Sequence, residues 1–136
     1  KQVWINLPVK DINRSRKFFK DIGFRENPRH KNNKNLASFL LGEHDFVMML
    51  FPEEQFESFS GSRISNTQHG AEFLMNIDAQ SRDEVDGFAE KVRNAGGKIF
   101  AEPSESQGWM YAFGFTDPDG HQQIFNNNES TTLFKF

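Results

Sequence analysis

The stretch TDPDGHQQIF, residues 116–125, carries the strongest fold signal in the chain. Pro118 suits the second position of a tight turn and Gly120 suits the left-handed position, so the stretch predicts a turn that leads into a short strand. Turns at the end of a sheet often border a small-molecule pocket. Ile124 lies in the predicted strand, and its apolar side chain cannot ligate a metal ion. Whether the protein is a metalloenzyme must therefore be inferred from other residues.

The second half of the chain predicts one strand, one helix and three further strands, in that order. The helix has the clearest signals. Ser81 and Glu84 form a capping box, in which each side chain accepts a hydrogen bond from a free backbone amide at the start of the helix. Gly96 follows the last residue of the apolar face of the helix and is expected to end it. We expect the strand after this helix to end before Pro103. The predicted strands are residues 72–77, 98–101, 110–115 and 121–125.

The first half predicts the same order of elements. Asp11 or Asn13 caps a helix that Gly23 ends. The turn at residues 42–45 joins the last two strands of this half as a hairpin. The predicted strands are residues 3–9, 24–28, 36–41 and 46–51.

This repeated order predicts two modules, residues 1–59 and 69–136, joined by a polar linker at residues 60–68. A short helix is expected around Phe56 and Phe59, ahead of the linker. Because neither module is large enough to bury its own apolar face well, we expect both to pack as one α+β domain over the whole chain. Two separate domains are the alternative.

Composition limits the class of protein. The 136 residues carry a net charge of −3, without a basic cluster that interleaves aromatic residues, which argues against nucleic-acid binding. The basic run at residues 25–34 is rich in Asn and predicts a solvated loop. The absence of cysteine excludes disulfides and thiolate chemistry and favours a cytoplasmic location. No apolar run is long enough to span a membrane, and 16 phenylalanines supply apolar area for a core or a cavity.

Three motifs resemble the vicinal oxygen chelate superfamily, which includes glyoxalase I, bleomycin- and fosfomycin-resistance proteins and extradiol dioxygenases. The motifs are NLPVKDINRSRKFFKDIGF at residues 6–24, EVDGFAEKVRNAGGKIFAEP at residues 84–103 and FTDPDGHQQIF at residues 115–125. They occur in the order of the family and span nearly the whole chain. The resemblance implies two βαβββ modules whose curled mixed sheets surround a cavity, and a homodimer that often completes the sites.

The resemblance also implies positions for metal ligands on the first and last strands of each module. Those positions fall at Trp4, near Met48, at Glu72 and at Ile124. Only the Glu72 carboxylate can ligate a hard divalent cation, and a single carboxylate does not hold a catalytic metal. We therefore expect no cofactor and no standard metal site, which disfavours glyoxalase and ring-cleaving dioxygenase activity. A Zn, Ni, Mn or Fe ion would require a different set of ligands.

The histidines and Glu72 leave alternatives open. His69 is either a linker residue or the best spare metal ligand, because it precedes Glu72 closely. His121 is expected to hydrogen-bond locally beside the turn, on the face opposite Ile124. His30 and His44 are expected to face solvent. Glu72 either lies in water at the start of its strand or faces the cavity, where it would need a basic partner or a cationic ligand.

Period-two alternation places a set of candidate residues on one side of the strands. Together they would form apolar walls with a few amide groups, the usual composition of a small-molecule pocket. The same side chains could instead pack against one another inside the curved sheets and form part of the hydrophobic core. The candidates for ligand binding are Trp4, Asn6, Met48, Glu72, Leu74, Trp109, Tyr111, Phe113, Gln122 and Ile124.

The leading hypothesis is a protein that binds a small apolar or aromatic molecule in this cavity without a standard metal site. The alternative is a metal-dependent lyase, isomerase or dioxygenase-like enzyme, in which Glu72 is the candidate catalytic residue at a metal site displaced toward His69, or a base that needs no metal. A third possibility is a structural or regulatory module with a filled cavity. Converging polar groups would favour the enzyme, and an open cavity with aromatic walls would favour the binding protein.

Overall fold

The computed structural model describes residues 1–128, and the chain divides into two compact units, residues 1–70 and 71–136. Each unit contains one four-stranded mixed sheet with the element order expected of a βαβββ module. The predicted α+β class is therefore confirmed. The division falls just after the predicted linker. Residues 129–136 of the predicted second module lie outside the described residues, and the packing of both modules as one domain stays a prediction.

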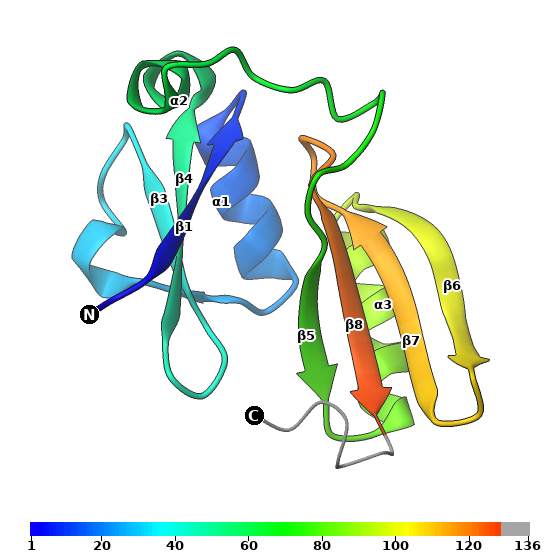
Figure 1. Ribbon diagram of the computed structural model, residues 1–136. Coiled ribbons are helices and arrows are strands. Elements are labelled where there is room, and N and C mark those ends of the chain that lie inside the picture. The colour runs from blue at the N-terminus through cyan, green and yellow to red at the C-terminus, as the bar shows by residue number, and fades with distance from the viewer. Residues whose placement is uncertain (129–136) are drawn as a thin grey trace. The chain divides into compact units, whose positions relative to one another are not determined.

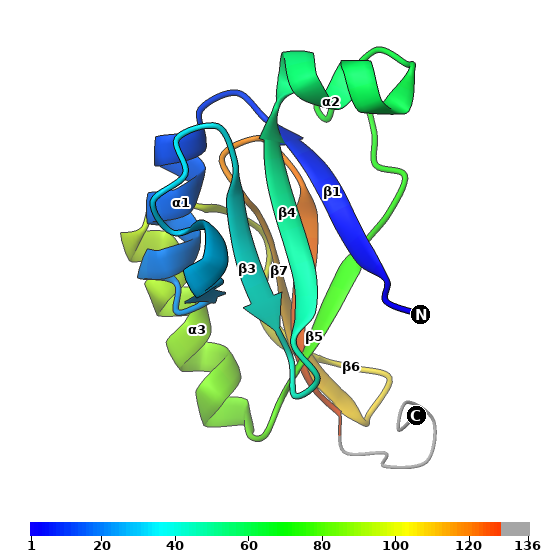
Figure 2. The same ribbon diagram turned by 90° about the vertical axis from the view of Figure 1, so that its left-hand side faces the viewer.

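The first unit has a sheet with strand order β1-β4-β3-β2 (Figure 1). Strands β1 and β4 are parallel, and β3 runs antiparallel to both of its neighbours. Helix α1 lies along one face of this sheet, and α2 crosses the ends of β1 and β4 (Figure 2). The elements are β1 (Trp4–Val9), α1 (Ile12–Asp21), β2 (Arg25–Glu26), a 3₁₀ turn (Pro28–His30), β3 (Ala37–Leu41), β4 (Phe46–Pro52) and α2 (Glu53–Ser60).

The core of the first unit lies between α1 and the sheet. Alternation along β1 turns Leu7 and Val9 toward this core, where both are almost fully buried, and leaves Trp4 and Asn6 on the opposite face. Phe19 of α1 is completely buried. Asp11 is the cap of the helix, because its side chain accepts a hydrogen bond from the Arg14 amide at 3.1 Å.

The second unit has the strand order β5-β8-β7-β6, and α3 covers one face of its sheet (Figure 1). The predicted capping box is confirmed: Ser81 Oγ accepts from the Glu84 amide at 3.1 Å, and Glu84 Oε2 accepts from the Gln80 amide at 2.7 Å. The elements are β5 (Met75–Ala79), α3 (Arg82–Asn94), β6 (Lys98–Ser106), β7 (Met110–Thr116) and β8 (Gln122–Asn128).

The predicted bounds of three strands in this unit are wrong, and one of these strands, β8, continues past residue 125 to Asn128. Strand β5 begins at Met75 and not at Glu72, so the residues before it are outside the sheet. Strand β6 does not end before Pro103 but continues through it to Ser106. Proline is tolerated here because β6 is an edge strand, and its register shifts between Ala101 and Ser104, where no backbone amide of residue 103 is needed.

The basic loop between β2 and β3 is tied to α1 by Arg16. Its Nε donates to Glu26 Oε2 at 2.8 Å, and its Nη2 donates to the carbonyl oxygens of Asn33 at 2.7 Å and Leu36 at 2.8 Å. The Arg16 side chain is only 16% exposed. The planar guanidinium thus holds one carboxylate and two carbonyls at once, which a single ammonium cannot reproduce. The loop is therefore anchored at one point and not simply solvated.

We expect Arg16→Lys to lower the free energy of unfolding by about 2 kcal/mol, because lysine keeps the charge beside Glu26 but loses the fork that holds the loop carbonyls. Urea unfolding followed by circular dichroism measures this change. Arg29→Lys, on an exposed residue of the same loop, is the matched control and should change stability by less than about 0.5 kcal/mol. Equal effects of both substitutions would contradict the anchoring role.

Candidate functional site

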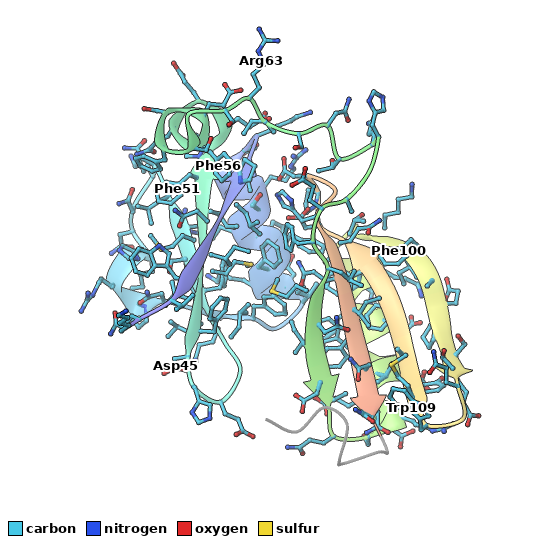
Figure 3. All side chains as sticks on the ribbon, viewed as in Figure 1. Asp45, Phe51, Phe56, Arg63, Phe100 and Trp109 are labelled. Carbon is cyan, nitrogen blue, oxygen red and sulfur yellow. The ribbon has the colours of Figure 1, made fainter. Side chains whose placement is uncertain are left out.

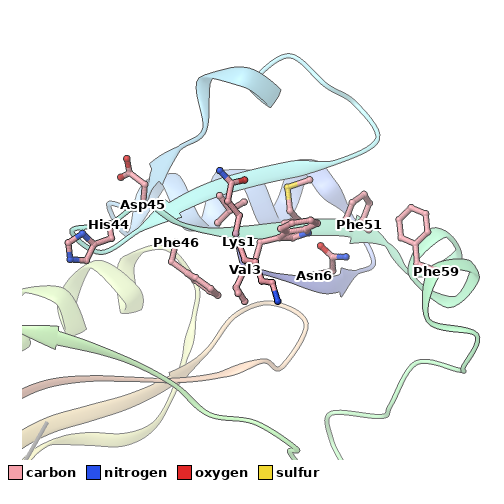
Figure 4. A pocket seen from close by; sticks show the side chains of 12 residues that line it. Lys1, Val3, Asn6, His44, Asp45, Phe46, Phe51 and Phe59 are labelled. Atoms are coloured by element: carbon pink, nitrogen blue, oxygen red, sulfur yellow. The ribbon is translucent and has the colours of Figure 1, made fainter. Parts of the chain in front are cut away.

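The face of the first sheet opposite α1 borders a pocket of about 790 Å³ (Figure 4). Figure 4 shows His44 and Asp45 at one end of this pocket and Phe51 and Phe59 at the other. All lining residues belong to the first unit. The apolar walls are formed by Val3, Trp4, Phe46, Val47, Met49 and Phe59.

The register of β1 against β4 sets the floor of the pocket. Trp4 pairs with Val47 and Asn6 pairs with Met49, so these four side chains share one face. Trp4 is 55% exposed although its indole is one of the largest apolar side chains. An aromatic side chain this exposed inside a concave apolar surface marks a binding site more often than a lone surface residue does.

Helix α2 supplies a second wall of the pocket. Its Phe59 is 59% exposed, and the Phe59 ring meets the Phe51 ring edge to face with centroids 5.1 Å apart. Edge-to-face packing holds Phe59 in place without burying it. The apolar end of the pocket is therefore formed by Phe51 of β4 and Phe59 of α2, whose rings hold each other in position.

Strand β4 carries a correction to the predicted site. Met48 was expected to line the cavity, but it pairs with Ile5 on the α1 face of the sheet and is completely buried. Met49 takes the expected place beside Asn6. A register difference of one residue moves a side chain to the other face of a sheet, so the position near Met48 was off by one. Trp4 and Asn6 lie on the predicted face.

The second sheet separates its predicted candidates onto two faces. Ile124 pairs with Asn76 and Gly114, and Gln122 pairs with Thr116, so both lie on the face opposite α3, as alternation predicts. Phe113 lies on the α3 face instead, almost fully buried, with its ring centroid 5.9 Å from that of Phe88. Phe113 is thus a core residue and not a cavity residue, because it pairs directly with the inward-facing Phe125.

Tyr111 also faces α3 and not a cavity. Its hydroxyl donates to Asp86 Oδ1 at 2.7 Å, and the Arg82 guanidinium lies 5.0 Å from the ring centroid. The hydrogen bond to Asp86 raises the pKa of Tyr111. Tyr111 therefore holds the start of α3 against the sheet. Alternation along β7 places Tyr111 on the same face as Phe113, so its position follows once Phe113 is known to face α3.

Trp109 and Phe100 lie toward opposite ends of the β6–β7 ladder (Figure 3). Trp109 was expected near the cavity rim, but it lies in the turn between the two strands. Phe100, which no sequence pattern singled out, covers Gly114 so closely that a Cβ on Gly114 would come within 2.3 Å of the ring. Gly114 thus makes room for an aromatic ring over this face of the second sheet.

Three of the four positions that the family resemblance assigns to metal ligands carry side chains that do not fit a metal ion. Trp4, Met49 and Ile124 offer no ligand that a hard cation would accept. Glu72 and His69 are both exposed and lie outside the strands, as does Leu74, which is 49% exposed. Within residues 1–128, no group of three or more His, Cys, Asp or Glu side chains is arranged to hold a metal ion.

The sequence matches the model of the Glyoxalase/Bleomycin resistance protein/Dioxygenase superfamily over residues 1–125. The chain therefore belongs to this superfamily, as its motifs indicate. No match is found among the curated proteins.

Solved structures share the fold along most of the chain. A hypothetical protein from S. aureus is 28% identical, with 93% of each chain covered and a TM-score of 0.83. A glyoxalase/bleomycin resistance protein/dioxygenase family enzyme from Burkholderia phytofirmans is 21% identical, with 92% of this chain and 96% of that chain covered and a TM-score of 0.76. The fosfomycin resistance protein FosX from Listeria monocytogenes is 20% identical, with 96% and 93% covered and a TM-score of 0.68.

Among the described residues, no helix combines the length and the apolar character needed to cross a bilayer.

A buried carboxylate, Asp117, lies in the β7–β8 turn of the second unit. The Asp117 side chain is completely buried; its Oδ1 accepts from the amides of Asp119 at 3.0 Å and His121 at 2.8 Å. Its Oδ2 has no hydrogen-bond partner within residues 1–128 and lies 4.0 Å from His121 Nε2. Burial raises the pKa of Asp117 to about 6, because desolvation outweighs the opposing effects of His121 and of the two amides. His121 lies beside the turn as predicted, and its backbone amide makes the local hydrogen bond to Asp117, but its side chain is buried and it lies before the first residue of β8.

We expect Asp117→Asn to flatten the pH dependence of stability. A raised carboxyl pKa means that the folded state holds the proton more tightly, so this contribution is complete below about pH 4 and is lost as the pH rises through 6. Between pH 4 and pH 7 the wild type should lose about 2 kcal/mol relative to Asp117→Asn, whose amide oxygen still accepts both backbone hydrogen bonds.

Urea unfolding at several pH values measures the difference. Asp78→Asn, on an exposed position of β5, is the control and should keep the wild-type profile. A wild-type stability that rises between pH 4 and pH 7 relative to Asp117→Asn would contradict the raised pKa.

Proposed function

We propose that the first unit binds a small apolar or aromatic molecule in the pocket on its sheet, without a bound metal ion. The observation that supports this proposal most is the half-exposed Trp4 on the floor of a pocket with apolar walls. Burying apolar surface is worth about 25 cal/mol per Å², and a stacked aromatic pair adds about 0.5–1.5 kcal/mol. An aromatic ligand gains both contributions against Trp4.

Apolar side chains stand at positions where the family resemblance implies metal ligands, and this supports the same function. At the first-strand position where family members carry a ligand, this chain has Trp4, and Met49 lies beside it on the neighbouring strand. Side chains of this size and character stack on and pack against an apolar molecule. The description of the family names a bleomycin resistance protein beside its enzymes, so membership alone does not require catalysis.

The enzyme alternative would rest on Glu72 and His69. Both are exposed and neither lies in a strand, and among the described residues no group of three or more possible metal ligands includes them. The binding function is therefore the better-supported proposal. The homodimer implied by the family resemblance and a cytoplasmic location stay predictions.

A thermal-shift screen against a panel of aromatic compounds tests the proposal. A compound present at 100 times its Kd should stabilise the protein by about 2.7 kcal/mol and raise Tm by about 5–10 °C. Trp4→Ala should reduce this shift by more than half because the stacking surface is lost, whereas Trp109→Ala, which removes the other tryptophan, should retain it. The proposal fails if no compound stabilises the wild type, or if Trp4→Ala responds to every compound as the wild type does.

A further inference from the structure

Asn6 is a polar group among the apolar walls of the pocket. It shares its face of β1 with Trp4 and pairs with Met49 on β4, and in the view of Figure 4 it lies toward the Phe51 and Phe59 end of the pocket. Its Oδ1 is buried and has no hydrogen-bond partner among the described residues. The other polar residues of the pocket wall are Lys1 and Gln2, which precede β1, and His44 and Asp45, which lie at the far end, where Asp45 is paired with Arg25.

A buried acceptor without a partner is an unfavourable state that a rotation of the side-chain amide can relieve. Most buried carbonyl oxygens in proteins accept at least one hydrogen bond, and leaving one unpaired carries the full desolvation penalty. The terminal amide torsion of asparagine is broad, so a rotation turns Oδ1 toward the pocket without a change in the backbone. In that orientation water can reach Oδ1 in the free protein, and a ligand N–H or O–H placed beside Asn6 would take the place of that water.

The apolar surroundings make this hydrogen bond discriminating. An aromatic molecule without a donor would occupy the same surface of Trp4 and leave Oδ1 unpaired. Sites that are built to hydrogen-bond a ligand group reject analogues that lack it, because a buried polar group is then left without a partner. Apolar contacts alone would not tell the two molecules apart.

Building on the proposed function, we propose that Asn6 is a specificity-determining residue that selects aromatic ligands carrying an N–H or O–H donor. The pocket thus distinguishes between molecules of the same shape by one hydrogen bond. We expect the donor-bearing member of a matched pair to bind about fivefold to twentyfold more tightly than its partner.

Matched pairs of compounds that differ in the donor alone test this inference. Suitable pairs are indole with benzofuran, 2-phenylindole with 2-phenylbenzofuran, and 2-naphthol with 2-fluoronaphthalene. Isothermal calorimetry gives Kd for each compound with the wild type, with Asn6→Leu and with Met49→Leu. Asn6→Leu should bind both members of a pair equally. Met49→Leu changes the neighbouring wall without removing a polar group, so it should keep the preference for the donor.

The outcomes distinguish a failure of the role proposed for Asn6 from a failure of the proposed binding function. A donor preference that Asn6→Leu abolishes and Met49→Leu retains supports the role of Asn6. Equal binding of both members by the wild type overturns that role and leaves the binding function standing. Binding of no compound in the panel overturns the binding function and the selectivity together. If Asn6→Leu does not fold, the wild-type ratios and Asn6→Ser, which should weaken the preference, decide the question.

Discussion

The parallel pairing of β1 with β4 is the constraint on which the pocket depends. It sets Trp4 beside Val47 and Asn6 beside Met49, and it turns Leu7 toward α1. Because side chains alternate along a strand, the burial of Leu7 and Val9 forces Trp4 and Asn6 onto the other face. The core of the first unit and its pocket therefore follow from a single register, and a shift of one residue would exchange them.

The sequence predicted most of the fold because its strongest features are local. The Ser81–Glu84 box, the glycines that follow the helices and the turn at Asp117 act through neighbouring backbone groups, so each could be placed without a structure. The strand bounds were less certain, because the edge position that lets β6 pass through Pro103 is a property of the whole sheet. The placement of Trp4, Asn6, Gln122 and Ile124 followed from alternation alone.

The rest of the site depends on contacts between elements distant in sequence. The pairing of Met49 with Asn6 on β1 shows that Met49, and not Met48, lies on the pocket face. The contact of Phe113 with Phe88 on α3 shows that Phe113 belongs to the core and not to a cavity. Phe59 has helical periodicity, but its place beside Phe51 depends on the angle at which α2 leaves β4. The closeness of Phe100 to Gly114 follows from the irregular register of β6, which composition does not reveal.

The central proposal is that the first unit binds an apolar or aromatic molecule on the surface where the family resemblance implies a metal site. Calorimetric titration of the tightest aromatic ligand tests it most directly, with the protein in excess chelator and again with added Zn, Ni, Mn or Fe(II). The account predicts Kd values that agree within about twofold under all conditions. Binding that appears only when one of these metals is present would contradict it.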